Sequence, residues 1–168
     1  PRDVLMIAVQ QRPAHLERRP KEAPPLAQIV HDFSEVLKRG RDLLTELYKP
    51  IKAPLVVTDI KAAELIKHAS NSFLAMKISF ANAIANICER TGADITEVAR
   101  GIGLDKRIGE KFLNAGLGFG GFCFPKDLAA FIRIAEKVGY DFELLRAVEN
   151  INAGQKNILM KKIEGLIW

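Results

Sequence analysis

The sequence predicts a mainly α-helical protein, and three observations support this fold class. Apolar residues recur at helical spacing over long stretches, above all in 58–89 and 128–135. Glycine or proline follows these stretches, as is typical where helices end. Only two short apolar runs, 4–9 and 54–57, have the length of strands, and a Pro/Arg-rich segment that we expect to be irregular follows the first of them.

Composition and charge limit the class of protein further. The chain has 168 residues, 48% hydrophobic and 27% charged, which is ordinary for a globular protein. The formal charge of +5 favours anionic ligands such as nucleotide diphosphates, and no motif indicates nucleic acid binding. We find neither a membrane-spanning run nor a signal peptide, so we expect a cytoplasmic protein without a membrane partner. Two cysteines and three histidines without ligand spacing predict neither a disulfide framework nor a metal site.

The first two helices follow from capping and periodicity. Ser34 is predicted as the N-cap of a helix that runs to Tyr48. A long helix is predicted from Thr58 to Glu89, and its segment 73–81 is apolar nearly all round, which indicates burial in a helical domain or in a subunit interface. Cys88 is interpreted as a small core residue of this helix.

The long helix also carries two polar pairs. Lys67 and Asn71 are one turn apart, so their side chains project from the same face. By physical chemistry alone they are a solvated lysine and a polar helix residue. Lys77 and Asn82 lie on another side of the helix and are assigned to structure or interface.

Three further segments complete the predicted helical pattern. Asp94–Glu97 is a capping box that opens a short helix ending at Gly101. Residues 104–109 have the composition of a charged surface turn. Asp141 is predicted to cap a last helix, Phe142 to Trp168.

The richest chemistry lies in residues 116–127, where a glycine-rich loop leads into a helix. Its glycines allow close approach of backbone N–H groups to a sugar or phosphate. Cys123 is predicted at the helix N-terminus, with Pro125 in the first turn, where the helix dipole and Lys126 favour a thiolate. Asp127 is either a charge complement to the helix dipole or a base near the thiol. We expect the sulfur at the mouth of a cleft where Lys67 and Asp127 converge. An inert buried cysteine is the alternative that the residues leave open.

Three motifs resemble one known family. GFGGFCFPKD (118–127) is similar to the catalytic-cysteine motif of the UDP-glucose/GDP-mannose dehydrogenase family. AELIKHASNSFLA (63–75) is similar to the segment with that family's active-site lysine and asparagine, and DKRIG (105–109) resembles its D-x-R-I-G segment. The resemblance covers about residues 34–168.

The resemblance implies a domain organisation. Residues 58–168 would be the central helical dimerisation domain, ending in a connecting helix, and 1–57 a divergent segment with a remnant of the preceding α/β Rossmann domain. No G-x-G-x-x-G follows a strand near the start, so we expect the fold that holds the NAD pyrophosphate, and a second nucleotide-binding domain, to be absent from this chain. A homodimer is implied.

The resemblance also implies an activity, the NAD-dependent oxidation of UDP-glucose to UDP-glucuronate for polysaccharide biosynthesis. Cys123 would form a thiohemiacetal and then a thioester, Lys67 with Asn71 would stabilise oxyanions, and Asp127 would act on water or on the lysine. Cys123 and Lys126 would meet NAD. The implied substrate contacts are Lys67, Asn71, Arg107, Asn114, Gly116, Gly118, Phe119 and Gly120. Arg107 would reach the substrate from a neighbouring subunit. The alternatives are a GDP-mannose or UDP-N-acetylhexosamine dehydrogenase, or a catalytically silent dimerisation module.

Overall fold

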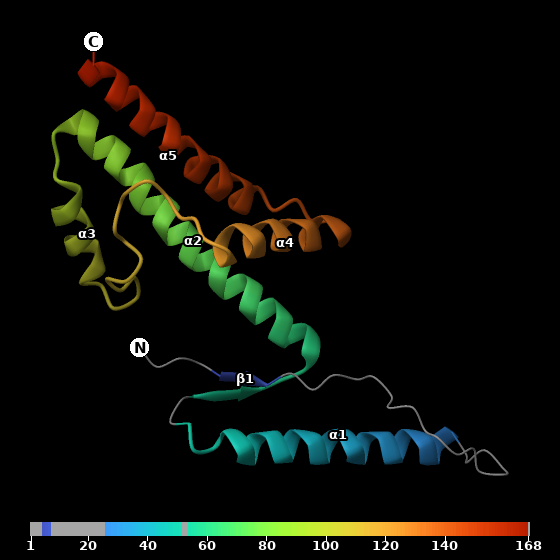
Figure 1. Ribbon diagram of the computed structural model, residues 1–168. Coiled ribbons are helices and arrows are strands. Elements are labelled where there is room, and N and C mark those ends of the chain that lie inside the picture. Colours follow the sequence, from blue (N-terminus) through green and yellow to red (C-terminus); the bar gives the residue numbers. More distant parts are fainter. Residues whose placement is uncertain (1–4, 8–25, 52–53, 168) are drawn as a thin grey trace. The chain divides into compact units, whose positions relative to one another are not determined.

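The computed structural model describes residues 5–7, 26–51 and 54–167, and side chains from residue 35 onward. These residues form five helices and two three-residue strands, which confirms the predicted mainly α fold (Figure 1). The prediction that the Pro/Arg-rich segment is irregular falls outside the described residues. The chain divides into two compact units, the first ending at Ile66 and the second beginning at Lys67.

The first unit contains a parallel strand pair and one helix. Strand β1 (Leu5–Ile7) pairs in parallel with β2 (Leu55–Val57), and Leu5 lies opposite Leu55. Parallel neighbours need a crossover connection, and the helix α1 (Leu26–Tyr48) lies between the two strands in sequence. Both predicted strands are therefore confirmed. The assignment of residues 1–57 to a Rossmann remnant stays a prediction.

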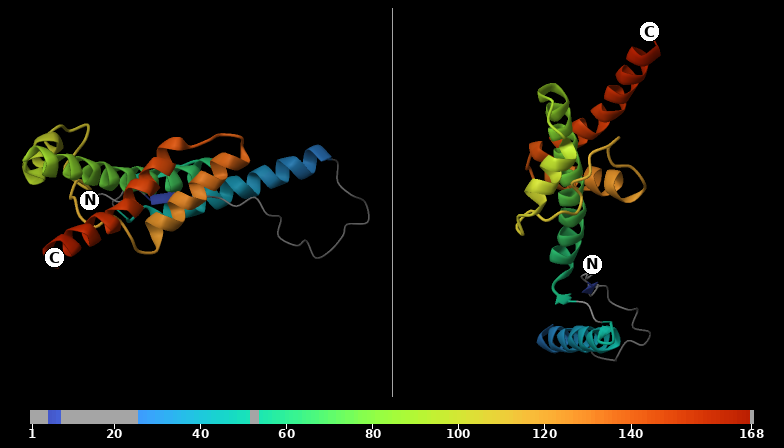
Figure 2. Two further views of the ribbon diagram at one scale, coloured as in Figure 1. Left: turned by 90° about the horizontal axis from the view of Figure 1, so that it is seen from above. Right: turned by 90° about the vertical axis from the view of Figure 1, so that its left-hand side faces the viewer.

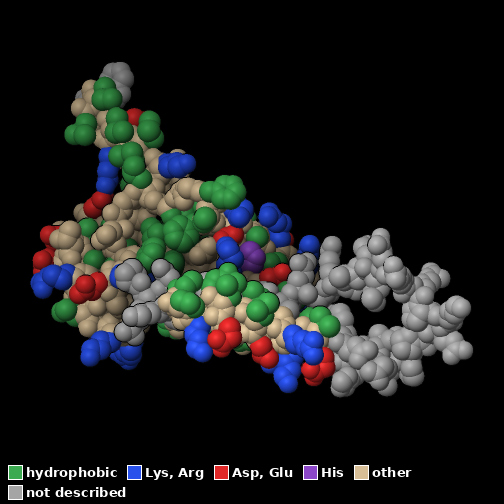
Figure 3. All heavy atoms as spheres, turned by 60° about the horizontal axis from the view of Figure 1, so that its bottom comes forward, with side chains coloured by type: hydrophobic (Ala, Val, Ile, Leu, Met, Phe, Trp, Pro, Cys, Tyr) green, Lys and Arg blue, Asp and Glu red, His purple; other side chains and the backbone are tan. Residues whose placement is uncertain are grey.

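Helix α1 begins at Leu26, so the prediction of Ser34 as its N-cap is wrong. Proline is tolerated at the start of a helix, and no glycine or proline interrupts the eight residues between Pro25 and Ser34, so the helix begins there and Ser34 lies in its interior. The predicted end at Tyr48 is confirmed. Among its described side chains, Val36, Leu43 and Leu47 are 66–71% exposed, and hydrophobic groups are visible along α1 in Figure 3.

The second unit is built on helix α2 (Ile60–Thr91), which enters it from the first unit. Helices α3 (Ile95–Gly103), α4 (Cys123–Lys137) and α5 (Glu143–Ile167) follow. The core of this unit is formed where α2, α4 and α5 meet, by Ala75, Leu128, Ile132, Leu145 and Val148. The end of α5 projects beyond the rest of this unit (Figure 2), and none of the described helices is long and apolar enough to cross a membrane.

The predicted start of α4 at Cys123 is confirmed, but the other helix ends of the second unit differ from prediction: α2 begins and ends two residues later than the predicted Thr58 and Glu89. Asp94 caps α3 through a 2.8 Å bond from the N–H of Thr96, but α3 ends at Gly103, two residues later than predicted. Glycine in a helix costs only about 1 kcal/mol, so Gly101 does not stop it. Helix α5 begins at Glu143, and Asp141 accepts a 2.9 Å bond from Arg146 Nε, so the predicted cap is wrong. An accessible guanidinium competes here with the helix N–H groups.

Candidate active site

Asp127 is the centre of a polar cluster between α2 and α4. Its side chain is only 3% exposed. One of its oxygens, Oδ2, accepts a 2.6 Å bond from Lys67 Nζ and a 2.5 Å bond from Asn71 Nδ2. Lys126 Nζ lies 3.8 Å from the other oxygen, Oδ1. The same-face pair predicted on α2 thus meets the carboxylate predicted on α4, and this convergence is confirmed.

The electrostatics of this cluster keep Asp127 ionised. The hydrogen bond from Lys67 is the largest cause of a lowered Asp127 pKa, and it outweighs the opposing effect of burial. The Asn71 bond and the charges of Lys67 and Lys126 lower the pKa further. One predicted role of Asp127, that of a charge complement to the helix dipole, is wrong. The carboxylate is instead buried against the side chains of Lys67 and Asn71 on α2. A carboxylate with a lowered pKa is a weak base and a strong anchor for cations.

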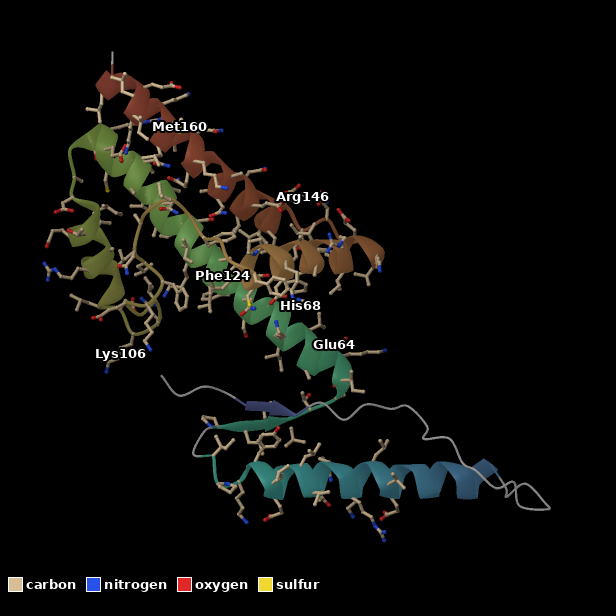
Figure 4. The ribbon with its side chains drawn as sticks, in the orientation of Figure 1. Glu64, His68, Lys106, Phe124, Arg146 and Met160 are labelled. Atoms are coloured by element: carbon tan, nitrogen blue, oxygen red, sulfur yellow. The ribbon has the colours of Figure 1, made fainter. Side chains whose placement is uncertain are left out.

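Cys123 is the first residue of α4 and is exposed. It lies one helical turn before Asp127, on the same face. Its neighbour Phe124 is at the start of α4 (Figure 4), and its ring lies edge-on to those of Phe112 and Phe119, with centroids 6.3 and 5.9 Å away. The alternative of an inert buried cysteine therefore applies to Cys88, which is 5% exposed, and not to Cys123. The thiolate character of Cys123 stays a prediction.

The glycine loop before Cys123 is held by two asparagines from different helices. Asn82 of α2 accepts a 2.7 Å bond from the N–H of Gly116. Asn152 of α5 accepts a 2.7 Å bond from the N–H of Phe119 and donates a 3.0 Å bond to the carbonyl of the same residue. Sequence reasoning correctly gave Asn82 a structural role but missed Asn152. The available signal was a polar residue on the α5 face that also carries the buried Leu145 and Val148.

Arg107 lies in a different part of the unit. Its Nη2 is 2.5 Å from Asp105 Oδ2, and its side chain is 89% exposed. Lys77 of α2 holds this turn by donating to the carbonyls of Ile108 and Gly109 at 2.8 and 3.1 Å, which confirms its predicted structural role. Figure 4 shows Lys106 in the loop after α3, apart from His68. Within one copy of the chain, Arg107 bonds to the side chain of Asp105, and the role of the arginine toward the substrate stays a prediction.

Comparison with known proteins identifies the family. The sequence model of the UDP-glucose/GDP-mannose dehydrogenase family, central domain, matches residues 61–154, which is more than half of the chain. The chain belongs to this family. The resemblance found in the cysteine, lysine and D-x-R-I-G motifs is confirmed by this match.

Individual family members are similar over most of this chain. UDP-glucose 6-dehydrogenase TuaD of Bacillus subtilis is 54% identical over 121 residues, which are 72% of this chain and 26% of that protein. This chain therefore spans about a quarter of the length of that curated relative.

Two solved dehydrogenase structures have a similar fold. A UDP-glucose dehydrogenase from the archaeon Pyrobaculum islandicum is 47% identical, with a TM-score of 0.67 over 69% of this chain and 27% of its own. A UDP-D-ManNAc dehydrogenase from Pyrococcus horikoshii is 26% identical, with a TM-score of 0.64 over 76% of this chain and 31% of its own.

Two hollows in the second unit lie away from Cys123. An open hollow of about 660 Å³ between α3 and the following loop is lined by Arg100, Glu110 and Asn114, among others. A smaller one of about 280 Å³, between α2, α5 and the glycine loop, is lined in part by Asn82 and Gly116. Cys123 lines neither hollow, so neither of them is the cleft that we predicted at the sulfur. The predicted substrate residues Asn114 and Gly116 border the hollows instead.

The described residues do not fit the pyrophosphate of NAD. Gly116, Gly118 and Gly121 have the G-x-G-x-x-G spacing, but they lie in a loop between α3 and α4. The dinucleotide fingerprint requires a strand directly before the glycines and a helix directly after them. Among the described residues, the contacts predicted with NAD are those of Cys123 and Lys126. No group of three or more His, Cys, Asp or Glu side chains in the described part of the chain is arranged to hold a metal.

Proposed function

We propose that this chain supplies the cysteine-bearing central part of an NAD-dependent UDP-glucose 6-dehydrogenase, which oxidises UDP-glucose to UDP-glucuronate. The observation that carries the proposal is the Lys67–Asn71–Asp127 cluster, one helical turn from the exposed Cys123. Family membership gives this cluster its chemical context. The finer assignments of domain 58–168, cytoplasmic location and polysaccharide biosynthesis stay predictions.

The reaction balances as two oxidations and one hydrolysis. Removal of a hydride and a proton converts the C6 alcohol of the sugar into an aldehyde. The thiolate of Cys123 adds to the aldehyde carbon to give a thiohemiacetal, whose loss of a second hydride and a proton gives a thioester. Water then cleaves the C–S bond, and the products are the carboxylate and the free thiol. Two NAD molecules, bound in succession, would each accept one hydride; the chain's own residues would bind and stabilise the sugar end.

Lys67 and Asn71 are proposed to stabilise the oxyanions of these steps. A lysine ammonium has three N–H groups, and one of them is directed at Asp127. The side chain is 54% exposed, so its other N–H groups are accessible to a substrate oxygen. Asp127 is proposed to hold the lysine and the asparagine in place, because its lowered pKa makes it a poor base for water. Of the two roles that the resemblance implies for Asp127, action on water or on the lysine, we therefore propose the second.

The substrate contacts are proposed to come from two copies of the chain. The glycine loop (Asn114 to Gly120) would receive the nucleotide sugar, and the exposed guanidinium of Arg107 would reach it from the neighbouring subunit. Phe73, Phe80 and Ile87 support a homodimer: they are 51–57% exposed and recur every seven residues along α2. A seven-residue apolar repeat forms one stripe that suits pairing of helices.

The test is NADH formation from UDP-glucose and NAD by the dehydrogenase of which this chain forms the central part. Two NADH per UDP-glucose are expected, and Cys123→Ser should lower the rate by about three orders of magnitude or more, as loss of a nucleophile does in other enzymes. Cys88→Ser is the matched control and should keep the activity. If GDP-mannose or a UDP-N-acetylhexosamine is turned over faster than UDP-glucose, that nucleotide sugar is the substrate instead.

A silent dimerisation module is the second candidate, and the same apolar stripe favours it. A chain that turns over no nucleotide sugar but sediments as a dimer supports this alternative. Phe73→Asp with Phe80→Asp should then yield monomers, because two charges would be buried in the interface. A wild-type chain that sediments as a monomer contradicts the dimer in both candidates.

A further inference from the structure

We propose that Asn152 is a positioning residue, which holds the glycine loop in the conformation that receives the nucleotide sugar. The inference rests on the proposed function for the identity of the ligand. It concerns a residue of α5, outside the cysteine, lysine and arginine motifs of this chain.

The contact fixes one residue of the loop from both sides. The side-chain amide of Asn152 accepts from the N–H of Phe119 at 2.7 Å and donates to the carbonyl of Phe119 at 3.0 Å. Two bonds to one residue restrict both of its backbone dihedrals, whereas a single bond leaves a rotation. The Phe119 ring adds a third anchor, edge-on to Phe124 with the centroids 5.9 Å apart.

Gly118 is shaped to this contact. Its φ is 99°, in the region that favours glycine, and a Cβ at this position would overlap the Oδ1 atom of Asn152. A side chain at 118 would therefore displace the asparagine as well as strain the backbone. The glycine at 118 and the asparagine at 152 thus form one device.

The device has a consequence for the predicted substrate contacts. Because the N–H of Phe119 is used by Asn152, it is not the donor that meets the ligand. The neighbouring N–H groups of Gly118 and Gly120 are the backbone donors that this arrangement assigns to sugar or phosphate oxygens. We therefore assign Phe119 as the anchor of the loop rather than as a substrate contact. Because its partner Asn152 belongs to α5, the conformation of the loop depends on how α5 packs.

Hydrogen exchange of the Phe119 amide tests the contact without substrate. Asn152→Ala removes two hydrogen bonds and should speed exchange at Phe119 about 30-fold. Asn152→Asp keeps the acceptor and loses the donor at neutral pH, so about tenfold is expected, and it serves if the alanine variant does not fold. Asn157→Ala, at an exposed asparagine of the same helix, is the control and should change nothing. The buried Val148 amide of α5 should exchange as in the wild type, which separates a local opening from global unfolding.

A double-mutant cycle with Gly118 checks that the two residues act through one contact. Gly118→Ala should speed exchange at Phe119 in the wild type and should add much less in the Asn152→Ala background. Unchanged exchange at Phe119 in both Asn152 variants, or strictly additive effects with Gly118→Ala, overturns the device.

Kinetics with UDP-glucose test the positioning role. Asn152→Ala should raise KM for UDP-glucose about tenfold or more with kcat within about threefold, because it disturbs binding by the loop rather than the sulfur chemistry. Asn152→Asp should fall between, and Asn157→Ala should match the wild type. Faster exchange at Phe119 with unchanged KM overturns the positioning role. If the wild type neither binds nor oxidises UDP-glucose, the proposed function fails and the nucleotide-sugar role fails with it, while exchange still decides whether Asn152 holds the loop.

Discussion

Two ion pairs of similar length differ in almost everything else. Lys67 and Asp127 are joined at 2.6 Å, Arg107 and Asp105 at 2.5 Å. The first pair spans 60 positions of sequence and has a carboxylate that is 3% exposed. The second spans two positions, and its arginine is 89% exposed.

The Lys67–Asp127 pair is formed by the packing of two helices, whereas the Arg107–Asp105 pair is formed within one turn. Asp127 reaches Lys67 only because α4 packs on α2, so its ion pair reports the tertiary structure. Asp105 holds Arg107 within a local turn, where water screens the attraction, so the pair adds little to folding. Distance alone would rank the two pairs as equal.

The largest effect expected from this comparison concerns packing. Leu128, next to Asp127 on α4, is 1% exposed, whereas Leu104, beside the Arg107 turn, is 66% exposed. Leu128→Ala should lower the free energy of unfolding by about 3 kcal/mol, through lost burial and a cavity. Leu104→Ala should have an effect near zero. Urea unfolding measures both, and equal losses would mean that the core does not lie under α4.

The carboxylates themselves come next. Asp127→Ala should lower the free energy of unfolding by about 2 kcal/mol, because a buried charge-assisted pair of hydrogen bonds is lost. Asp105→Ala should cause a smaller loss, near the limit of urea unfolding measurements. A loss for Asp105→Ala as large as that for Asp127→Ala would contradict the distinction between the two pairs.

Acid should act through Asp127 in a defined direction. Its folded-state pKa is lowered from the usual 3.8, chiefly by the Lys67 hydrogen bond, so its contribution to stability is present above that pH. The contribution is lost as the pH falls from there through the lowered pKa. The free energy of unfolding of the wild type should therefore fall more steeply below about pH 4 than that of Asp127→Asn. Parallel pH profiles would show that the carboxylate is not paired in solution.

The smallest effect concerns the support of the Arg107 turn. Lys77→Met removes the bonds from α2 to the carbonyls of Ile108 and Gly109, and should cost about 1 kcal/mol or less. Hydrogen exchange in the turn should rise several-fold while exchange in α4 stays unchanged. Spread of the effect into α4 would show that the two regions are coupled.

Particular residues show how far the sequence could be interpreted. The same-face spacing of Lys67 and Asn71, and the place of Cys123 at a helix start, follow from helical geometry and were predicted correctly. The predicted start of α1 was wrong because the capping preference of Ser34 is weaker than the tendency of the helix to continue through it. The predicted cap of α5 was wrong because Asp141 accepts a hydrogen bond from Arg146 instead. Asn152 was missed because its partner is a backbone segment 33 positions away, which no local pattern shows.

The sequence by itself determined the helical fold class, the order of the elements and the family motifs, because periodicity, helix ends and short motifs are local properties of the chain. The tertiary structure alone decided that Asp127 is buried against Lys67 and Asn71 and that Asn152 holds the glycine loop. The physical reason is that burial and hydrogen-bond partners depend on how helices pack, and residues far apart in sequence compete for the same partner only once that packing exists.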